Sequence, residues 1–463
     1  MITRRRFLAA VAAPPALRPA PSKKRVVVAG AGMSGLCCAL ELGRRGHDVV
    51  VVEASGRIGG HVMTVRDGLA DGLYADAGAE HFYKPGYDLL WAYLEEFKLP
   101  LISYPRRQGL LRSFRGQLYT PEMLAERSVL RELGFNQQEV AFLSRNPFGD
   151  LPALYYSAYV DRFSDIDRPF DAGLNRLDAI TATEFLRRQG ASQMAAQMAG
   201  GSRSALQAVW HSAIRRKRGM AWLETNLYRV AGGNQRITEA FAQRLGDRVR
   251  LHCPVTSIKR FDRGVRITCR QSGAPAPGIF EADRLVNAMP LATLRQIPVE
   301  PEWPPAKNYV IRNMPYDSHA RVVFQSRTRF WERDHLSPNM NLGEPGLSTV
   351  WSMAEEVKTA RGILIGTAGT TSEEVATATY RRRYPGKFAD IEQARVIHWN
   401  RDPWSMACLP LPLRPGELSK YWPEVVRPCG PVHFAGVSAD AYPFGLESAI
   451  RAARRVAEEI DAA

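Results

Sequence analysis

A short glycine-rich turn near the start of the chain has residue types and a spacing that could hold phosphate groups. The turn follows the pattern GxGxxG and consists of Gly30, Ala31, Gly32, Met33, Ser34 and Gly35. In this pattern the first glycine permits a tight turn, the second lets a pyrophosphate approach the backbone, and the third lets a helix pack closely on a strand. Amide groups at the start of that helix attract phosphate oxygens. The turn therefore predicts a dinucleotide-binding site.

A second motif follows the turn after an apolar run. Its members are Glu53, Ala54, Arg57, Gly59 and Gly60. The carboxylate of Glu53 can accept hydrogen bonds from the ribose hydroxyls of an adenosine. The spacing resembles the Glu-x-x-x-Arg-x-Gly-Gly signature of flavin-containing amine oxidases and their relatives. That resemblance implies that Arg57 and Gly59 line the pyrophosphate and ribityl chain of FAD.

Later segments resemble the same family, in the family's order along the chain. They add expected FAD contacts at Gly78, Ala79, Glu80, Val255, Gly436 and Leu446. By this resemblance, residues 76–81 pass beside the flavin ring, and Val255 reaches the adenine through its backbone. The helix expected to begin near Leu446 would direct its amides at the pyrimidine end of the flavin and stabilise negative charge there.

Catalytic residues are left unassigned, because no paired acid and base stands out. The residues considered for the substrate pocket are His81, Trp404, Tyr442 and Phe444. A histidine in such a loop more often positions the backbone than transfers protons. In the family that the chain resembles, the flavin carries the chemistry, so a missing catalytic triad excludes nothing.

Two departures from the family pattern leave the substrate and the electron acceptor open. Many of these enzymes have a lysine near flavin N5, whereas the stretch aligned with it, residues 294–298, contains Gln296 and no lysine. No lysine lies between Lys259 and Lys307. The paired aromatic rings that enclose an amine in monoamine oxidases align with Leu409 and Gly445. The electron acceptor is therefore either O2, as in an oxidase, or another acceptor, as in a dehydrogenase.

Cys408 lies where monoamine oxidases carry the cysteine that bonds to their flavin. Many relatives hold FAD without a covalent bond, and a buried free cysteine is common, so noncovalent FAD is expected and a bond to Cys408 is the alternative. The six cysteines include no CxxC pair and no cysteine–histidine spacing typical of zinc. No metal site is expected.

The elements that must position these residues can be predicted from the pattern of apolar residues. β-Branched runs at 25–29 and 48–52 indicate strands, and helical spacing over 34–45 indicates a helix between them. Residues 249–258 are typical of an edge strand interrupted by a proline, and residues 285–289 of a buried strand.

The order of these segments predicts two interleaved domains, since 463 residues exceed what one hydrophobic core usually holds. The expected fold is α/β, with a Rossmann-type FAD-binding domain like that of glutathione reductase and an α+β substrate domain. We expect the FAD-binding domain at 25–87, 225–305 and 395–463. The substrate domain is expected at 88–224, a largely helical segment, and at 306–394.

The resemblance implies an FAD-dependent oxidoreductase that oxidises an amine, polyamine or amino acid by hydride transfer to flavin N5. Its partners would be a small-molecule substrate and either O2 or an electron-acceptor protein. One alternative is a desaturase or oxidase of an apolar substrate, similar to phytoene desaturase or protoporphyrinogen oxidase. Another is a noncatalytic FAD-binding module, and the sequence leaves the oligomeric state open.

Composition narrows the class of protein further. Lysine and arginine exceed aspartate and glutamate by 62 to 47, but these charges are spread along the chain and do not alternate with aromatic residues. Nucleic-acid binding is therefore not expected. No stretch of about 18 apolar residues occurs, so no integral membrane segment is expected.

The first 24 residues read as a targeting segment. Three arginines, Arg4, Arg5 and Arg6, precede Phe7, Leu8 and a short alanine-rich run. The pattern resembles a twin-arginine signal, a route that exports folded proteins to the periplasm. The alternative is a disordered basic tail on a cytoplasmic protein.

Overall fold

The computed structural model describes residues 22–270, 277–316, 319–369, 371–383, 386, 388–406, 412–442 and 445–463. Several sequence-based predictions fall outside these ranges. They are the export signal up to residue 21 and the roles considered for Cys408, Leu409 and Phe444.

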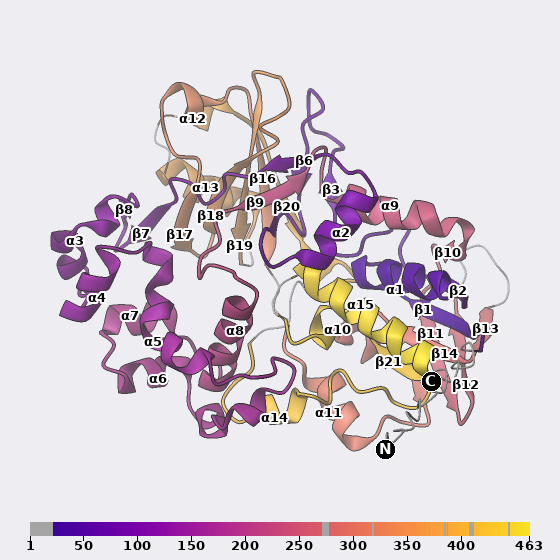
Figure 1. The fold of residues 1–463 in the computed structure, drawn as a ribbon. Coiled ribbons are helices and arrows are strands. Elements are labelled where there is room, and N and C mark those ends of the chain that lie inside the picture. Colours follow the sequence, from indigo (N-terminus) through magenta and orange to yellow (C-terminus); the bar gives the residue numbers. More distant parts are fainter. Residues whose placement is uncertain are drawn as a thin grey trace, which may run out of the picture.

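A five-stranded parallel sheet forms the centre of one half of the molecule (Figure 1). Its strands, in order, are β10 (Val249–Arg250), β2 (Asp48–Val52), β1 (Arg25–Ala29), β14 (Arg284–Asn287) and β21 (Val432–Phe434). Helix α1 (Met33–Arg44) connects β1 to β2 and lies beside α15 (Gly445–Ala462), the helix from the C-terminal end. The expected Rossmann-type domain is confirmed, and its sheet joins segments that are far apart in the sequence.

Strong burial explains why the first β-α-β unit could be predicted from sequence. Val26–Ala29 and much of α1 are almost fully buried, because helices cover both faces of a parallel sheet. The predicted strand at 249–258 is wrong in one respect. It consists of two strands, since β10 ends at Arg250 and β11 (Val255–Phe261) begins after Pro254 in another sheet. Proline lacks the N–H that a continuous ladder requires.

A four-stranded sheet packs beside this domain. Its strands, in order, are β13 (Gly278–Ala282), β12 (Gly264–Cys269), β11 and β15 (Val299–Glu300). Short strands complete the region, namely β3 (Thr64–Val65) with β4 (Ala75–Asp76), and β5 (Phe82–Tyr83), β9 (Leu227–Val230) and β6 (Leu101–Ser103). The helices here are α2 (Asp88–Glu96), α9 (Gln235–Leu245), α10 (Leu291–Leu294), α11 (Pro305–Asn313) and α14 (Leu418–Tyr421).

A seven-stranded sheet forms the upper part of the molecule in Figure 1. Its strands, in order, are β20 (Ile391–His398), β16 (Ala320–Ser326), β19 (Gly362–Ala368), β18 (Leu347–Met353), β17 (Met340–Glu344), β7 (Leu111–Phe114) and β8 (Gln117–Tyr119). Helices α12 (Phe330–Arg333) and α13 (Glu373–Arg383) belong to the same stretch of chain. β20 extends past residue 394, the expected end of the substrate domain. The domain boundaries themselves stay a prediction.

Residues 88–224 are not uniformly helical, contrary to the expectation from sequence. β7 and β8 pair into the seven-stranded sheet, and β6 pairs with β9. Most of the helices between residues 127 and 217 form a helical lobe, at lower left in Figure 1, whereas α2 lies beside α15. The helices of this stretch are α3 (Arg127–Glu132), α4 (Gln137–Leu143), α5 (Leu151–Val160), α6 (Ala182–Arg188), α7 (Gln193–Ala199) and α8 (Ala205–Lys217). Among the described residues, no helix has both the length and the apolar character needed to span a bilayer.

Candidate functional site

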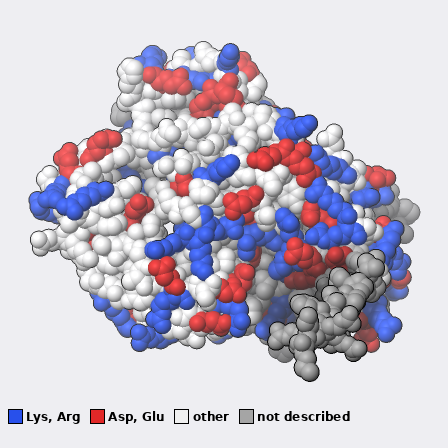
Figure 2. Space-filling model, in the orientation of Figure 1, with Lys and Arg blue, Asp and Glu red and all other residues white. Residues whose placement is uncertain are grey.

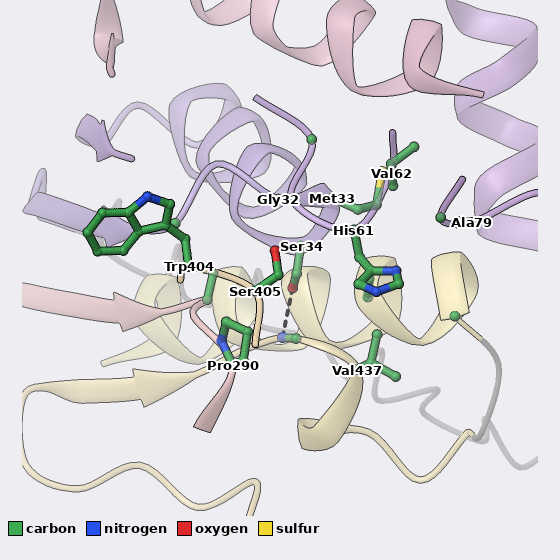
Figure 3. Close-up of a pocket in the computed structure, with 18 of the residues that line it drawn as sticks. Gly32, Met33, Ser34, His61, Val62, Ala79, Pro290, Trp404, Ser405 and Val437 are labelled. Atoms are coloured by element: carbon green, nitrogen blue, oxygen red, sulfur yellow. Dashed lines mark hydrogen bonds between the residues drawn. The ribbon is translucent and has the colours of Figure 1, made fainter. Parts of the chain in front are cut away.

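A cavity of about 530 Å³ lies where the two ends of the chain meet (Figure 3). Every residue expected to contact FAD lines it except Gly35, namely Gly30, Gly32, Met33, Ser34, Glu53, Ala54, Arg57, Gly59, Gly60, Gly78, Ala79, Glu80, Val255, Gly436 and Leu446. The structure thus brings the predicted set together in one place. Their individual contacts with FAD stay a prediction.

The glycines of the first turn have different surroundings. Gly30 has a φ of +105°, which side-chain-bearing residues rarely adopt. A Cβ at Gly35 would lie 1.9 Å from the carbonyl oxygen of Gly30, so this glycine lets α1 pack against the turn. A Cβ at Gly32 would meet its nearest heavy atom at 4.0 Å, in Gly60. Gly32 therefore leaves open space, as a cradle for a phosphate group requires.

Helix α1 begins at this open space without a capping group. Gly32 is its N-cap residue, no side chain caps the helix, and its first turn contains no acidic residue. Uncapped amides and the helix dipole together favour an anion at this position. The geometry fits a pyrophosphate.

The carboxylate of Glu53 is held firmly in the cavity wall. Its Oε2 accepts a hydrogen bond of 2.7 Å from the amide of Ala31. Its Oε1 accepts from the amide and the hydroxyl of Ser55, at 2.9 and 2.8 Å. Glu53 is thus fixed at the end of β2, where the adenosine ribose of a dinucleotide lies in Rossmann folds.

A direct hydrogen bond connects the N-terminal and C-terminal parts of the site. The amide of Gly436 donates to the hydroxyl of Ser34 over 2.9 Å (Figure 3). Arg57 adds a cation beside the same cavity, donating to the carbonyl of Gly60 at 2.8 Å and lying 3.5 Å from Asp402. Uncapped amides, a guanidinium and a ribose-facing carboxylate are the donor and acceptor set that FAD needs.

A cluster of charged residues forms another part of the cavity wall. Glu80 makes ion pairs with Arg106 and, at 3.7 Å, with Arg321. Burial alone would raise the pKa of Glu80, but the two guanidinium groups outweigh it and lower that pKa to about 2. Glu80 is therefore ionised at neutral pH.

His81 lies beside this cluster and is neutral at pH 7. Burial and the charge of Arg106 together lower its pKa to about 4, against the opposing effect of Glu80. Its Nε2 lies 3.3 Å from the hydroxyl of Tyr83, another residue of the cavity wall. An uncharged imidazole can donate and accept hydrogen bonds at this wall.

Sequence reasoning missed Arg106 and Arg321, which come from the chain between β6 and β7 and from β16. The guanidinium of Arg321 donates to Thr367 at 3.0 Å and to the carbonyl of Gly78 at 3.3 Å. An arginine within the fully buried strand β16 was a signal in the sequence, since arginine is rarely buried without a partner. His61, Tyr83 and further lining residues were missed as well.

Of the aromatic residues considered for the substrate pocket, Trp404 and Tyr442 lie in different places. Trp404 lines the cavity, as does Gly445. Tyr442 does not, because its hydroxyl donates to the carbonyl of Gly86 at 2.8 Å within the protein interior. Gln296 is exposed, and among the described lining residues there is no lysine. The cationic side chains of the cavity are arginines.

No metal centre is formed by the part of the chain that the structure describes. Within it, no three His, Cys, Asp or Glu side chains are grouped so that they could hold a metal ion. Noncovalent attachment of FAD stays a prediction, because Cys408 lies outside the described residues.

Comparison with known proteins bears on the whole chain. A family model described as flavin containing amine oxidoreductase matches residues 33–461. The chain is 24% identical over 473 residues to Bacillus subtilis YobN, provisionally named an L-amino-acid oxidase, and the match covers 95% of each protein. It is 26% identical over 474 residues to Mycobacterium tuberculosis AofH, provisionally named a flavin-containing monoamine oxidase, covering 94% of this chain and 96% of AofH.

A solved structure is similar to this protein over nearly the whole chain. Cyclohexylamine oxidase from Brevibacterium oxydans matches with a TM-score of 0.77 at 20% identity, covering 95% of this chain and 99% of that one. This likeness shows a shared fold. Together with the family match over residues 33–461, and with a cavity whose groups fit the cofactor, it leads to one conclusion: the chain belongs to the flavin-containing amine oxidoreductases and uses FAD.

Proposed function

We propose that this FAD-dependent oxidoreductase acts on an α-amino acid and holds the substrate carboxylate at Arg106 and Arg321. The observation that carries the proposal is a local excess of positive charge in the part of the cavity wall around Glu80. Two guanidinium groups face a single carboxylate there, that of Glu80, and His81 is neutral. An anion is attracted to such a wall, whereas the second ammonium group of a diamine is repelled.

Arg321 also has one hydrogen-bond donor that is not used within the described part of the chain. Its Nε is buried and forms no hydrogen bond with a described residue. Burying a charged donor without a partner is unfavourable, so a substrate oxygen at this position would improve the energy of the complex. Arginine suits a carboxylate particularly well because its planar fork can donate two parallel hydrogen bonds.

Bound FAD supplies the chemistry by accepting the hydride equivalent from the carbon next to the substrate nitrogen. The residues of the chain bind and orient the substrate for this step. Arg106 and Arg321 would fix the carboxylate, and Glu80 holds both guanidinium groups in place. The neutral imidazole of His81 would accept a hydrogen bond from the amino group, which must be unprotonated to react.

The family match favours amine or amino-acid oxidation over a desaturase or a noncatalytic FAD module. Within the family, the names of the relatives point both ways, to an amino acid for YobN and to amines for AofH and cyclohexylamine oxidase. The arginine pair favours the amino acid.

Matched substrates that differ by one carboxylate test this proposal. FAD-loaded protein is mixed without oxygen with L-phenylalanine or 2-phenylethylamine, and with L-lysine or cadaverine, while the flavin absorbance is followed. We expect bleaching by an amino acid and not by its decarboxylated counterpart. Bleaching by the amines alone would refute the proposal. Admitting air afterwards reports whether O2 reoxidises the flavin.

Variants of Arg321 separate its charge from its shape. Arg321→Gln should raise KM for the amino acid about tenfold or more, because a hydrogen bond to a charged group is lost. Arg321→Lys keeps the charge and should lose less. An Arg321→Gln protein with an unchanged KM would remove this residue from the substrate site.

A further inference from the structure

We infer that the preferred amino acid carries a second acidic group, which binds to an arginine cluster made of Arg107, Arg112 and Arg215 beyond Tyr83. This inference rests on the proposed amino-acid substrate and adds the chemistry of its side chain. The natural substrates would then be acidic amino acids with a side-chain carboxylate. Nothing in the cofactor site requires these three arginines.

The arginine cluster lies one aromatic ring away from the wall that would hold the α-carboxylate. His81 contacts the hydroxyl of Tyr83 at 3.3 Å, and the guanidinium of Arg107 lies 5.6 Å from the centre of the same ring. Arg215 is electrostatically coupled to Tyr83, Tyr87 and Arg107. Tyr83 and Tyr87 both line the cavity, whereas the three arginines lie outside its lining. We therefore place the second acidic group on a side chain that extends past these rings towards the cluster.

Arg107 and Arg112 have no carboxylate partner in the described part of the chain. Arg107 donates to the backbone carbonyl of Glu224 at 2.6 Å, and the guanidinium of Arg112 lies 5.4 Å from the ring centre of Phe148. The carboxylate of Glu224 itself accepts from the amides of Thr225 and Asn226. Neither arginine forms an ion pair with a described aspartate or glutamate.

This arrangement disfavours the charged forms of Arg112 and Arg215. Burial lowers the pKa of Arg112, and the charge of Arg107 lowers it further. Burial likewise lowers the pKa of Arg215. Desolvated like charges are unfavourable unless an anion compensates them, and such strained groups beside a cavity are typical of binding sites. A ligand with a carboxylate would supply that anion.

The surface outside the cluster has the same sign of charge. Basic side chains form a band across the middle of the face shown in Figure 2, over the C-terminal end of α8. This helix end contributes the exposed residues Arg216 and Lys217 next to Arg215. A positive field at a surface raises the rate at which anionic ligands arrive there.

Acid and amide pairs of equal size test the inference. Anaerobic flavin reduction is measured with L-glutamate and L-glutamine, and with L-aspartate and L-asparagine. We expect kcat/KM to favour one acid over its amide by roughly ten- to a hundredfold, the usual effect of a hydrogen bond between charged groups. In Arg107→Gln and Arg112→Gln proteins, this ratio should fall towards one. Arg188→Gln is the matched control, because it removes an exposed charge from α6 that is paired with Glu184, and it should keep the ratio.

A second measurement uses the unaltered protein, so it does not require that the arginine variants fold. Glutarate and butyrate differ by one carboxylate, and their binding can be followed through the flavin spectrum of the unaltered protein. Tighter binding of glutarate supports the inference. Equal turnover of acids and amides, together with equal binding of the two ligands, would overturn it while leaving amino-acid oxidation intact. Reduction by amines and by no amino acid would instead refute the proposed function.

Discussion

Two glycines of the same turn are constrained by different neighbours. Gly35 is needed for packing, because a Cβ there would overlap the carbonyl oxygen of Gly30. Gly32 is not, since it has an ordinary φ of −74° and open space beside it. Its lack of a side chain matters only when a phosphate group occupies that space.

Alanine substitutions should therefore separate folding from cofactor binding. Gly32→Ala should leave the stability of the FAD-free protein unchanged and weaken FAD binding, because the added methyl group fills the phosphate cradle. Gly35→Ala should lower the free energy of unfolding by about 3 kcal/mol, since it overpacks the turn. Denaturant unfolding and FAD titration of both variants check this. A Gly32→Ala protein that binds FAD normally would argue against a pyrophosphate at this turn.

His81 makes the stability of the fold depend on pH. Its pKa is about 4 in the folded protein, against about 6.5 in the unfolded chain. The unfolded chain binds more protons between these values, so stability is complete above pH 6.5 and is lost as the pH falls towards 4. In His81→Asn, the loss between pH 7 and pH 5 should be smaller by about 2 kcal/mol, as measured by unfolding at both values.

Neighbouring acids do not obscure this comparison. The pKa of Glu80 is about 2, so its contribution is lost only below pH 4.5. Asp76 and Asp440 have pKa values raised to about 6 by burial and favour the fold as the pH falls from 6 towards 3.8. They titrate in both proteins and cancel from the difference. Equal pH dependence of the two proteins would contradict a buried neutral His81.

Individual site residues could be predicted from sequence where their partners are close in the chain. Gly30, Gly35 and Glu53 belong to one β-α-β unit, so their spacing alone indicated a nucleotide site. Arg106 could not be assigned, because its partner Glu80 lies 26 residues earlier and in another element. Arg321 reaches the same carboxylate from the seven-stranded sheet, and no short motif encodes that contact.

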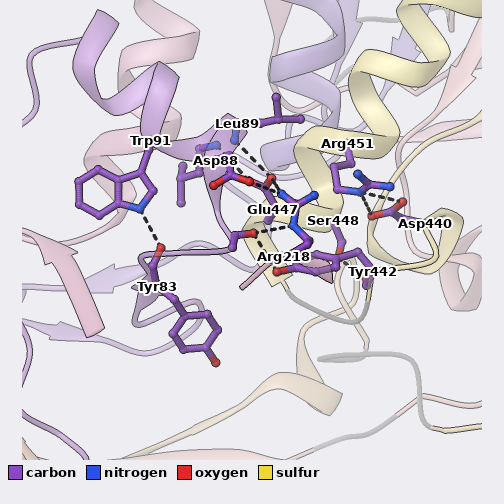
Figure 4. Close-up of polar contacts among 12 residues, drawn as sticks. Tyr83, Asp88, Leu89, Trp91, Arg218, Asp440, Tyr442, Glu447, Ser448 and Arg451 are labelled. Carbon is purple, nitrogen blue, oxygen red and sulfur yellow. Dashed lines mark hydrogen bonds and ion pairs between the residues drawn. The ribbon is translucent and has the colours of Figure 1, made fainter. Parts of the chain in front are cut away.

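Among the elements, the buried carboxylate of Glu447 connects three helices, α2, α8 and α15, that lie far apart in the sequence. Glu447, in the first turn of α15, is fully buried and accepts hydrogen bonds from the amides of Leu89 and Leu90 at the start of α2 (Figure 4). Arg218, just after α8, donates to Glu447 at 2.9 Å and reaches Asp88 at the same distance. The helical lobe is thereby connected to the helix that closes the cofactor site.

Arg218→Met should lower the free energy of unfolding by about 3 kcal/mol, because it leaves the Glu447 carboxylate buried without its cation. Adding Glu447→Gln to this variant should restore part of the loss. Asp88→Asn is the matched control, because it removes the exposed partner of the same arginine and should cost less than about 1 kcal/mol. Similar losses in Arg218→Met and Asp88→Asn would show that the buried pair does not hold the helices together.

Some helices and strands could be predicted from sequence and others could not. β1, α1 and β2 have continuous apolar patterns, because they are buried by their immediate neighbours. β7 and β8 were missed within an expected helical segment. They are short, and β7 is completed by pairing with β17, more than 200 residues later. Strand character of this kind comes from the partner more than from the residues themselves.

For the whole molecule, the cofactor site is completed only when both ends of the chain are in place. α1 packs along α15, and Ser34 binds the amide of Gly436. FAD that spans this junction binds the folded state and not the unfolded chain, and so must stabilise the fold. Cofactor binding therefore requires nearly the entire chain to be synthesised and folded first.

We propose that this requirement is met by export of the folded protein, with Arg4 and Arg5 as the arginine pair of a twin-arginine signal. An export route for unfolded chains would deliver this protein without its cofactor, whereas the twin-arginine route carries folded proteins. Replacing Arg4 and Arg5 with lysine should therefore leave the FAD-loaded protein in the cytoplasm. Arg18→Lys, a change of the same kind outside the arginine motif, should still allow export. Cell fractionation with flavin fluorescence measures both variants. FAD-loaded protein that reaches the periplasm equally well without the arginine pair would show that residues 1–24 are a basic tail and not a signal.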